Sequence, residues 1–332
     1  MQASDTLVIP APLVRAGPEP RPTLCGEHRK RLLAIMTALD EQDYDFVTPT
    51  PATHRRVVTR PGRQLAECLV DVLGWSLPTA AGMLEPGIES ALLDAGLLIR
   101  RTDGLLKPLL RASRVQTQLF LHSAYPTHAS NSVFLGPDSL RFSLLINANL
   151  PDELETILDY GAGAGVGGIL AARQAPGAVL TIADINPKAL FLASVNADHA
   201  GVEHRTIAAN RPADVGGSTD LMVTHPPFLI DRQQRTYRDG GDLYGARLSL
   251  EWALAGAKLL NPGGRFIMHT GVSIVHGHDV LLGALEEQLP KEWSLDYHEL
   301  DSDIFGDELD TPAYAEADRI AAVAVIIDRG SI

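Results

Sequence analysis

Residues 156–168 read T-I-L-D-Y-G-A-G-A-G-V-G-G, and this stretch decides the fold. An apolar run meets Asp159, and five glycines then follow within eight residues before apolar residues resume at Ile169. Glycine has no Cβ, so a strand that turns through glycines into a helix brings its backbone close to a ligand. The stretch therefore predicts a nucleotide-type ligand at the carboxyl end of a parallel strand.

The glycines alone leave three interpretations open. Gly163, Gly165 and Gly168 fit the dinucleotide fingerprint. Asp184 lies 21 residues after Gly163, where that fingerprint has a ribose-binding acid. The phase D-x-G-x-G-x-G, read from Asp159, instead resembles motif I of class I S-adenosylmethionine (SAM)-dependent methyltransferases. A tight turn without a ligand is the third interpretation.

A second motif favours the methyltransferase interpretation. After the strand-like residues 221–224 comes His225-Pro226-Pro227-Phe228. It resembles the N-P-P-[YF] motif of methyltransferases that act on the amino groups of glutamine, adenine or guanine, whereas a dinucleotide site has no use for a double proline there. The chain is similar to class I methyltransferases related to the N5-glutamine release-factor enzymes, with an altered motif. The resemblance implies SAM as the cofactor.

Residues 134–142 read F-L-G-P-D-S-L-R-F and extend this resemblance. In a related bacterial methyltransferase group, the stretch before motif I covers the SAM pocket. Ordinary packing of Phe134 and Phe142 in a core is the alternative.

Strand-like and helix-like segments alternate from residue 155 onward. Strands are expected at 157–160, 179–183, 204–208, 221–224, 265–270, 294–300 and 320–327. Helices are expected at 165–173, 187–200, 248–260 and 277–288. The alternation predicts an α/β fold with a doubly wound, mostly parallel, Rossmann-like sheet of seven strands. The last two strands, with no helix between them, suit the antiparallel edge of class I methyltransferases.

The chain before this sheet divides into two parts. Residues 1–22 are rich in proline and predict an extended arm. Residues 23–115 predict short helices, among them 64–73, 79–83 and 86–95, and a hairpin that turns at Asp103-Gly104. Short helices followed by a hairpin resemble a winged-helix module, which would form a mainly helical cap domain. The SAM-binding domain is expected over residues 116–332.

Composition excludes several classes of protein. The chain has 332 residues and 45% hydrophobic content, and it lacks the apolar run of about 18 residues that a membrane span needs. The N-terminus shows no secretory signal, so a cytoplasmic protein is expected. Cys25 and Cys68 have no metal-ligand spacing, and no metal is expected.

The net charge of −13 bears on the partners of the chain. Such a field repels a phosphate backbone, and no aromatic residues separate the basic positions Arg100, Arg101, Lys107, Arg111 and Arg114. Nucleic acid is therefore an unlikely partner on this reasoning, and a homodimer formed through the cap is possible. The acidic residues between 299 and 310 form either a solvated loop or a border of the active site.

The resemblance assigns a set of residues to the cofactor. Gly161, Gly163 and Gly165 are expected to admit SAM close to the backbone. The carboxylate of Asp159 is expected to accept a hydrogen bond from the methionine ammonium. The remaining predicted cofactor residues are Asp184 at the ribose (or as a helix N-cap before Pro187), Ile185, Asn210 at the adenine amino group, and Pro226.

Three departures from the family pattern mark the candidate catalytic residues. Tyr160 occupies a position that is usually a small aliphatic, and Phe228 replaces the commoner tyrosine. His225 replaces the asparagine that would hold an amide, and an imidazole can accept a proton but cannot hold an amide in that way. An aromatic face can also attract the sulfonium of SAM. Either the motif has drifted and remains structural, or the acceptor is neither a glutamine amide nor a base.

These residues predict a SAM-dependent transferase that acts on a small molecule, as a methyltransferase of secondary (natural-product) metabolism. The alternative is an intramolecular cyclase, in which the α-amine of SAM attacks its own γ-carbon to give azetidine-2-carboxylate and methylthioadenosine. SAM alone would then be the substrate. An N5-glutamine protein methyltransferase and a SAM-binding winged-helix regulator are lesser alternatives.

Overall fold

The computed structural model describes residues 26–330, and its centre is a twisted sheet. The strand order is β11-β12-β9-β8-β5-β6-β7, with a short β10 paired to the end of β9. Strands β7, β6, β5, β8 and β9 run parallel, and β12 and β11 add an antiparallel edge. The predicted doubly wound, mostly parallel sheet is confirmed. Its strands are β5 (Thr156–Tyr160), β6 (Val179–Asp184), β7 (His204–Ala208), β8 (Thr219–Thr224), β9 (Leu260–Val275), β10 (His278–Asp279), β11 (Ser294–Asp301) and β12 (Ala317–Asp328).

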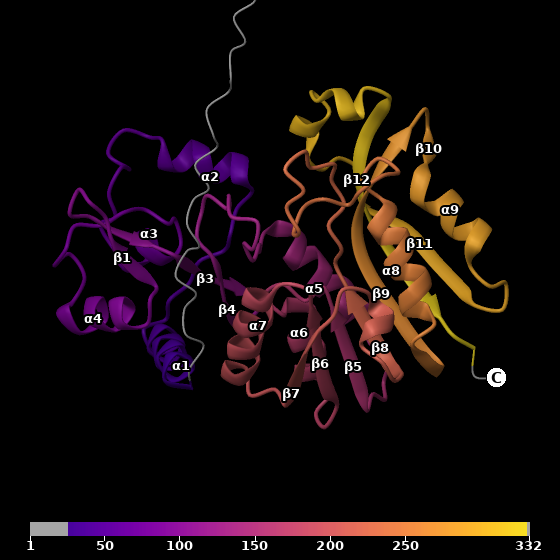
Figure 1. Cartoon of the computed structure of the whole chain (residues 1–332), viewed down its shortest axis with the longest axis horizontal. Helices are drawn as coiled ribbons and strands as arrows, with labels where there is room; N and C mark the ends of the chain where they lie inside the picture. The colour runs from indigo at the N-terminus through magenta and orange to yellow at the C-terminus, as the bar shows by residue number, and fades with distance from the viewer. Residues whose placement is uncertain (1–25, 331–332) are drawn as a thin grey trace, which may run out of the picture.

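Two layers of helices cover the sheet (Figure 1). Alternate residues of a strand point to opposite faces, so Ile157 packs in one apolar cluster while Leu158 and Tyr160 pack in another. The first face is covered by α5 (Pro137–Asn149), α6 (Val166–Gln174) and α7 (Pro187–His199), and the second by α8 (Arg247–Ala257) and α9 (Val280–Gln288). Short 3-10 turns occur at Pro212–Asp214, Gly306–Glu308 and Pro312–Tyr314.

The N-terminal part, drawn in indigo to magenta in Figure 1, contains small elements that precede the sheet. They are α1 (Gly26–Glu41), α2 (Pro51–Val58), α3 (Leu69–Leu73), α4 (Pro86–Asp94), β1 (Leu98–Arg100), β2 (Leu106–Pro108), β3 (Leu110–Val115) and β4 (Gln118–Ser123). β1 and β2 form the predicted hairpin, and β3 pairs with β4. The expected domain boundary at 115/116 falls in the turn of that second hairpin, and the division into domains stays a prediction. The predicted arm of residues 1–22 lies outside the described residues.

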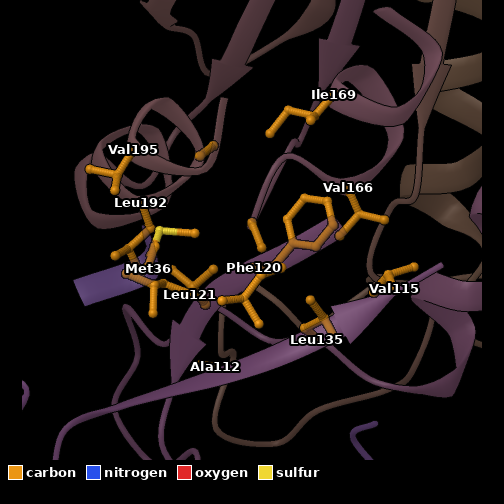
Figure 2. Close-up of a cluster of buried hydrophobic side chains, with 14 of the residues drawn as sticks. Met36, Ala112, Val115, Phe120, Leu121, Leu135, Val166, Ile169, Leu192 and Val195 are labelled. Atoms are coloured by element: carbon orange, nitrogen blue, oxygen red, sulfur yellow. The ribbon is translucent and has the colours of Figure 1, made fainter. Parts of the chain in front are cut away.

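A continuous apolar core joins the N-terminal part to the sheet domain (Figure 2). Phe120 and Leu121 of β4 are fully buried in one cluster with Ile169 of α6 and Val195 of α7. Asn196 adds hydrogen bonds across the same junction: its Oδ1 accepts from the N–H of Leu121 at 2.8 Å, and its Nδ2 donates to the Leu121 and Ala164 carbonyls. The N-terminal part is therefore held against α6 and α7, which flank the glycine turn.

Two local expectations were wrong. Residues 79–83 form no helix because Thr79 pairs with Leu106 through a backbone bridge and both of its backbone bonds go there. Of the helix expected at 64–73, only α3 forms, because the carboxylate of Asp71 turns back to accept from the N–H of Glu67. In both places tertiary pairing overrides a helical pattern.

The basic residues of β3 do not form an exposed stripe. Arg111 is buried, its Nε donates to the Gly74 carbonyl, and its guanidinium lies 5.3 Å from the ring centroid of Phe46. Arg114 donates to the carboxylate of Asp40. Both arginines serve packing within the N-terminal part.

No helix within residues 26–330 is long and apolar enough to cross a bilayer.

Asn196→Ala is expected to destabilise the fold by about 2–3 kcal/mol, because three buried backbone groups lose their partner. Chemical denaturation measures this change. Asn147→Ala is the matched control, since its bonds to Gln116 and Gln174 lie at the surface, and it should cost about 0.5 kcal/mol or less. Equal effects of the two variants would show that the Asn196 junction carries no special stability.

Candidate functional site

A cavity of about 560 Å³ opens at the carboxyl ends of β5, β6 and β8. It contains ten of the eleven predicted site residues, with walls added by residues 125–128 and 234–239. Those ten are Asp159, Tyr160, Gly161, Gly163, Asp184, Ile185, Asn210, His225, Pro226 and Phe228. The two motifs that the sequence places about 60 residues apart therefore meet in one cavity, since β5 and β8 are neighbours in the sheet.

The glycine turn fits tightly between its neighbours. Gly161 has φ +67°, and a Cβ there would lie 2.5 Å from the ring of Trp252 on α8. Gly165, the remaining predicted residue, does not line the cavity: it has φ +82°, and a Cβ would lie 2.8 Å from the side chain of Ile169. Gly161 therefore allows the turn to pass under Trp252, and Gly165 allows helix α6 to begin.

Asp159 lies at the end of β5 and is 2% exposed. Its Oδ2 accepts a hydrogen bond of 2.8 Å from the backbone N–H of Gly168. Burial raises the pKa of this carboxyl to about 7, although the Gly168 bond opposes the shift. The group is therefore poised to ionise near neutral pH if a cation arrives.

Asp184 lies at the end of β6 with both carboxylate oxygens held by backbone. Oδ2 accepts from the N–H of Gly163 at 3.0 Å, and Oδ1 accepts from the N–H of Asn186 at 2.8 Å. Burial raises its pKa, and the backbone bonds lower it. The N-cap of α7 is Asn186, whose side chain accepts from the N–H of Lys188, so Asp184 is not the helix cap. Each carboxylate oxygen keeps a further lone pair for a ligand.

Two further predicted residues lie beside Asp184 at the rim. Ile185 is 53% exposed, which is unusual for a large apolar side chain next to a cavity, and Asn210 is also exposed. Together they offer an apolar surface and an amide at the same edge. This pairing suits a flat heterocycle with a polar edge.

His225 sits among aromatic rings at the other end of the cavity. Its ring centroid lies 5.6 Å from Phe142, 6.0 Å from Phe228, onto which it stacks, and 4.7 Å from His269. Burial lowers the pKa of His225, against the opposing effect of the Asp138 carboxylate. No hydrogen bond reaches the His225 side chain from any residue between 26 and 330. The lowered pKa favours the neutral form of the His225 imidazole.

Phe228 and Tyr160 are placed by close packing. A Cβ at Gly271 would lie 2.2 Å from the ring of Phe228, so only glycine leaves room for that ring on β9. Tyr160 is 2% exposed and meets Trp252 edge-on, with ring centroids 4.6 Å apart. Tyr160 therefore belongs to the α8 side of the sheet as well as to the cavity wall.

A loop closes one side of the cavity. The hydroxyl of Tyr237 donates to the Thr127 carbonyl at 2.6 Å, and its ring stacks on Phe134. Arg235 pairs with Asp231 through two hydrogen bonds, which lower the pKa of that carboxyl to about 2. The contacts of Tyr237 join the loop to the segment before α5, and the Arg235–Asp231 pair lies within the loop.

The acidic segment borders the site, which decides between the two interpretations of residues 299–310. Phe305 lines the cavity and meets the ring of Phe228 edge-on at 5.5 Å. Its neighbours are paired, since Glu308 binds Arg238 and Asp301 binds Arg141. Trp252 was not predicted, because its contacts with Gly161 and Tyr160 depend on the folded chain.

Residues 138–243 match a family model described as the methyltransferase small domain. This segment is a methyltransferase small domain. It contains the glycine turn and the H-P-P-F motif, so the match confirms the methyltransferase family expected from the sequence. The strand order agrees with the expected class I fold, and SAM is the cofactor that this family implies. In the described part of the chain, no group of three or more His, Cys, Asp or Glu side chains could hold a metal ion.

Two curated relatives of this chain were found by sequence. The release factor glutamine methyltransferase of Chlorobaculum tepidum is 34% identical over 126 residues, which are 33% of this chain and 43% of the relative. The ribosomal RNA small subunit methyltransferase C of Shigella flexneri is 33% identical over 85 residues, which are 26% of this chain and 25% of the relative. The chain thus spans less than half the length of these relatives.

A solved structure of the 16S rRNA N2 G1207 methyltransferase of Thermus thermophilus, in complex with AdoMet and guanosine, also aligns. It has a TM-score of 0.43 and 16% identity, over 76% of this chain and 64% of that one.

These relatives correct one expectation about partners. Nucleic acid was judged unlikely from the net charge of −13, but a relative of this domain is named for a ribosomal RNA and another for a protein release factor. Mean charge describes the field of the whole molecule, whereas a substrate meets the local surface around the cavity. The charge therefore gives no ground for excluding nucleic acid, nor for limiting the partners to small molecules.

The buried carboxyl of Asp159 predicts a pH dependence of cofactor binding. An ammonium group nearby favours the ionised carboxylate, so S-adenosylhomocysteine should bind more tightly as pH rises through about 7. Calorimetry between pH 5.5 and 7.5 measures this. In Asp159→Asn, which keeps an oxygen for Gly168, the dependence should vanish. Affinity that stays level across this range in the unaltered protein would contradict the assignment.

Proposed function

We propose that the chain transfers the methyl group of SAM to a small-molecule nucleophile that enters the cavity beside His225. The observation that carries this proposal is the meeting of two sets of residues in one cavity. One set, around Asp159 and Asp184, has the chemistry to hold a nucleoside and an ammonium. The other set, around His225 and Phe228, has the chemistry to receive a nucleophile.

The proposed cofactor position follows from the polar groups at the rim. The ribose hydroxyls donate to Asp184, and the adenine lies on the apolar surface of Ile185 with its amino group at Asn210. The methionine part lies along Gly161 and Gly163, with its ammonium at Asp159. In this orientation the sulfonium points toward the aromatic end of the cavity.

The aromatic end suits a sulfonium and a nucleophile. Aromatic faces attract a cation by about 0.5–2 kcal/mol each, and Phe142 and Phe228 flank His225 on two sides. Because His225 is neutral, it can take a proton from the nucleophile while the nucleophile attacks the methyl carbon. S-adenosylhomocysteine leaves, and the proton stays on the imidazole until it passes to solvent.

The replacement of asparagine by His225 supports an acceptor that needs a base. An amide side chain would orient a planar N–H group by paired hydrogen bonds, which a single imidazole nitrogen cannot do. An amine or hydroxyl needs only proton removal. The cavity walls contributed by Pro51, Tyr125 and Tyr237 favour a compact acceptor of this kind, as in secondary metabolism.

Cyclisation of SAM itself is a second candidate, favoured by the aromatic lining. The α-amine, after giving its proton to a base, would attack the γ-carbon, and the bond from that carbon to sulfur would break. The products are azetidine-2-carboxylate and methylthioadenosine. This reaction needs the methionine chain to fold back on itself, and orientation in a shaped cavity supplies much of such a rate.

One assay separates these reactions. The protein is incubated with SAM alone, and S-adenosylhomocysteine is resolved from methylthioadenosine by chromatography. Small amines and alcohols, a glutamine-containing release-factor peptide and ribosomal RNA are then added separately. S-adenosylhomocysteine formed only with a small amine or alcohol supports the proposal, methylthioadenosine from SAM alone selects cyclisation, and turnover only with peptide or RNA overturns the small-molecule assignment.

His225→Asn, which restores the family's usual residue, should lower kcat by about 10²–10⁴-fold, because the base is lost. The affinity for S-adenosylhomocysteine should stay within about twofold. Asp184→Ala is the matched control: it should weaken that affinity by about 2–3 kcal/mol through loss of hydrogen bonds to a charged group. Full activity of His225→Asn would show that His225 is structural.

A further inference from the structure

His269 of β9 is a buried titratable residue that the proposed reaction does not use. Its side chain is 0% exposed, and both ring nitrogens lack a hydrogen-bond partner within residues 26–330. Its ring meets that of His225 edge to face, with centroids 4.7 Å apart and an interplanar angle of 85°. An apolar side chain would fill this place without leaving nitrogens unpaired.

The position of His269 follows from the alternation of β9. Residues 267, 269 and 271 point to the same face of the sheet. Ile267 packs in the apolar core, and Gly271 leaves space for the ring of Phe228. His269 lies between them, directly under His225. β9 therefore lies beneath the H-P-P-F motif, and His269 is the polar residue among the three that face it.

Buried polar groups without partners reduce stability, and most buried nitrogens in folded proteins are paired. Residues that break this rule are concentrated at functional sites. Within residues 26–330 no hydrogen-bond partner accounts for the nitrogens of His269, and the ring that it contacts is that of His225. His54 also has one unpaired ring nitrogen, but within residues 26–330 only His269 has both ring nitrogens unpaired, and it lies next to the proposed base.

We propose that His269 is a positioning residue that fixes the ring plane of His225 and, as a neutral imidazole, stabilises His225 when His225 holds the proton. This inference rests on the proposed role of His225 as a base. His269 is not among the residues that line the cavity, so it would act through His225. A ring nitrogen of neutral His269 can accept a hydrogen bond from protonated His225, which no hydrocarbon side chain in the same space can do.

The charges around this pair are consistent with the role. Burial holds the pKa of His269 well below its usual range, and the nearby His225 and Arg141 lower it further. Asp138 of α5 faces His225 and favours its protonated form. Arg141 is itself bonded to Asp138 and Asp301. Of the two imidazoles, His225 is the one beside a carboxylate, so the proton stays there.

Two variants test the inference in the full chain. His269→Phe keeps an aromatic ring and removes the nitrogens, and His269→Leu removes the ring as well. Both should lower kcat at least tenfold, with the Kd for S-adenosylhomocysteine within twofold of the unaltered protein. Both should also unfold at a temperature no lower than the unaltered protein, because the unpaired nitrogens are gone.

A spectroscopic measurement keeps the test independent of turnover. In protein labelled with ¹⁵N-histidine and saturated with S-adenosylhomocysteine, the signals of His225 are assigned with His225→Asn and followed against pH. The pKa of His225 should fall in both variants. If either folded variant keeps the titration and the pH profile of kcat, or loses thermal stability while keeping kcat, His269 is only a packing residue.

Failure of the proposed function gives a different pattern. No product from SAM with any acceptor would remove the role of His225 as a base. The titration of His225 would still show whether His269 acts on it.

Discussion

The hydrogen bond between the Asp159 carboxylate and the N–H of Gly168 is the constraint on which the site depends. It ties the central strand β5 to the first turn of α6, so the intervening glycines must form a tight loop. A Cβ at Gly168 would lie 2.6 Å from the Cβ of Asp159, so the contact requires glycine. The loop exposes backbone to the cavity, and the N–H of Gly163 in turn holds Asp184. The cofactor end is therefore built from local geometry.

The acceptor end is assembled from distant segments. His225 and Phe228 follow the end of β8. β9 lies beneath them through His269 and Gly271, and the cavity walls come from the N-terminal part and the segment around Phe305. These pieces can vary independently without disturbing the glycine turn. The site thus combines a turn built from neighbouring residues with walls that come from segments far apart in the sequence. We infer that specificity for the acceptor depends on the segments that form the acceptor end.

The same division explains what the sequence could predict. The glycine turn, Asp184 and the H-P-P-F motif are contiguous patterns whose geometry is local, and the alternation after residue 155 revealed the sheet. Trp252 and His269 could not be found this way, because each gains its meaning from a residue on another strand or helix. Arg111 shows the converse: its charge suggested a basic surface, but its side chain is buried against Phe46. Sequence pattern reports the chemistry of a side chain, whereas burial depends on tertiary packing.

Buried polar groups at the site lower the stability of the folded protein, and the rest of the fold must offset this loss. Burial raises the pKa of Asp159, so the apo protein disfavours the charge that a cofactor ammonium would stabilise. The unpaired nitrogens of His269 add a second cost on the acceptor side. Asp159 lines the cavity and His269 lies beneath His225, while the apolar core that joins β4 to α6 and α7 is extensive and contains Phe120 fully buried. The N-terminal part therefore has two structural roles at the site: it contributes Pro51 and Tyr125 to the cavity wall, and it packs against α6, which begins at the glycine turn.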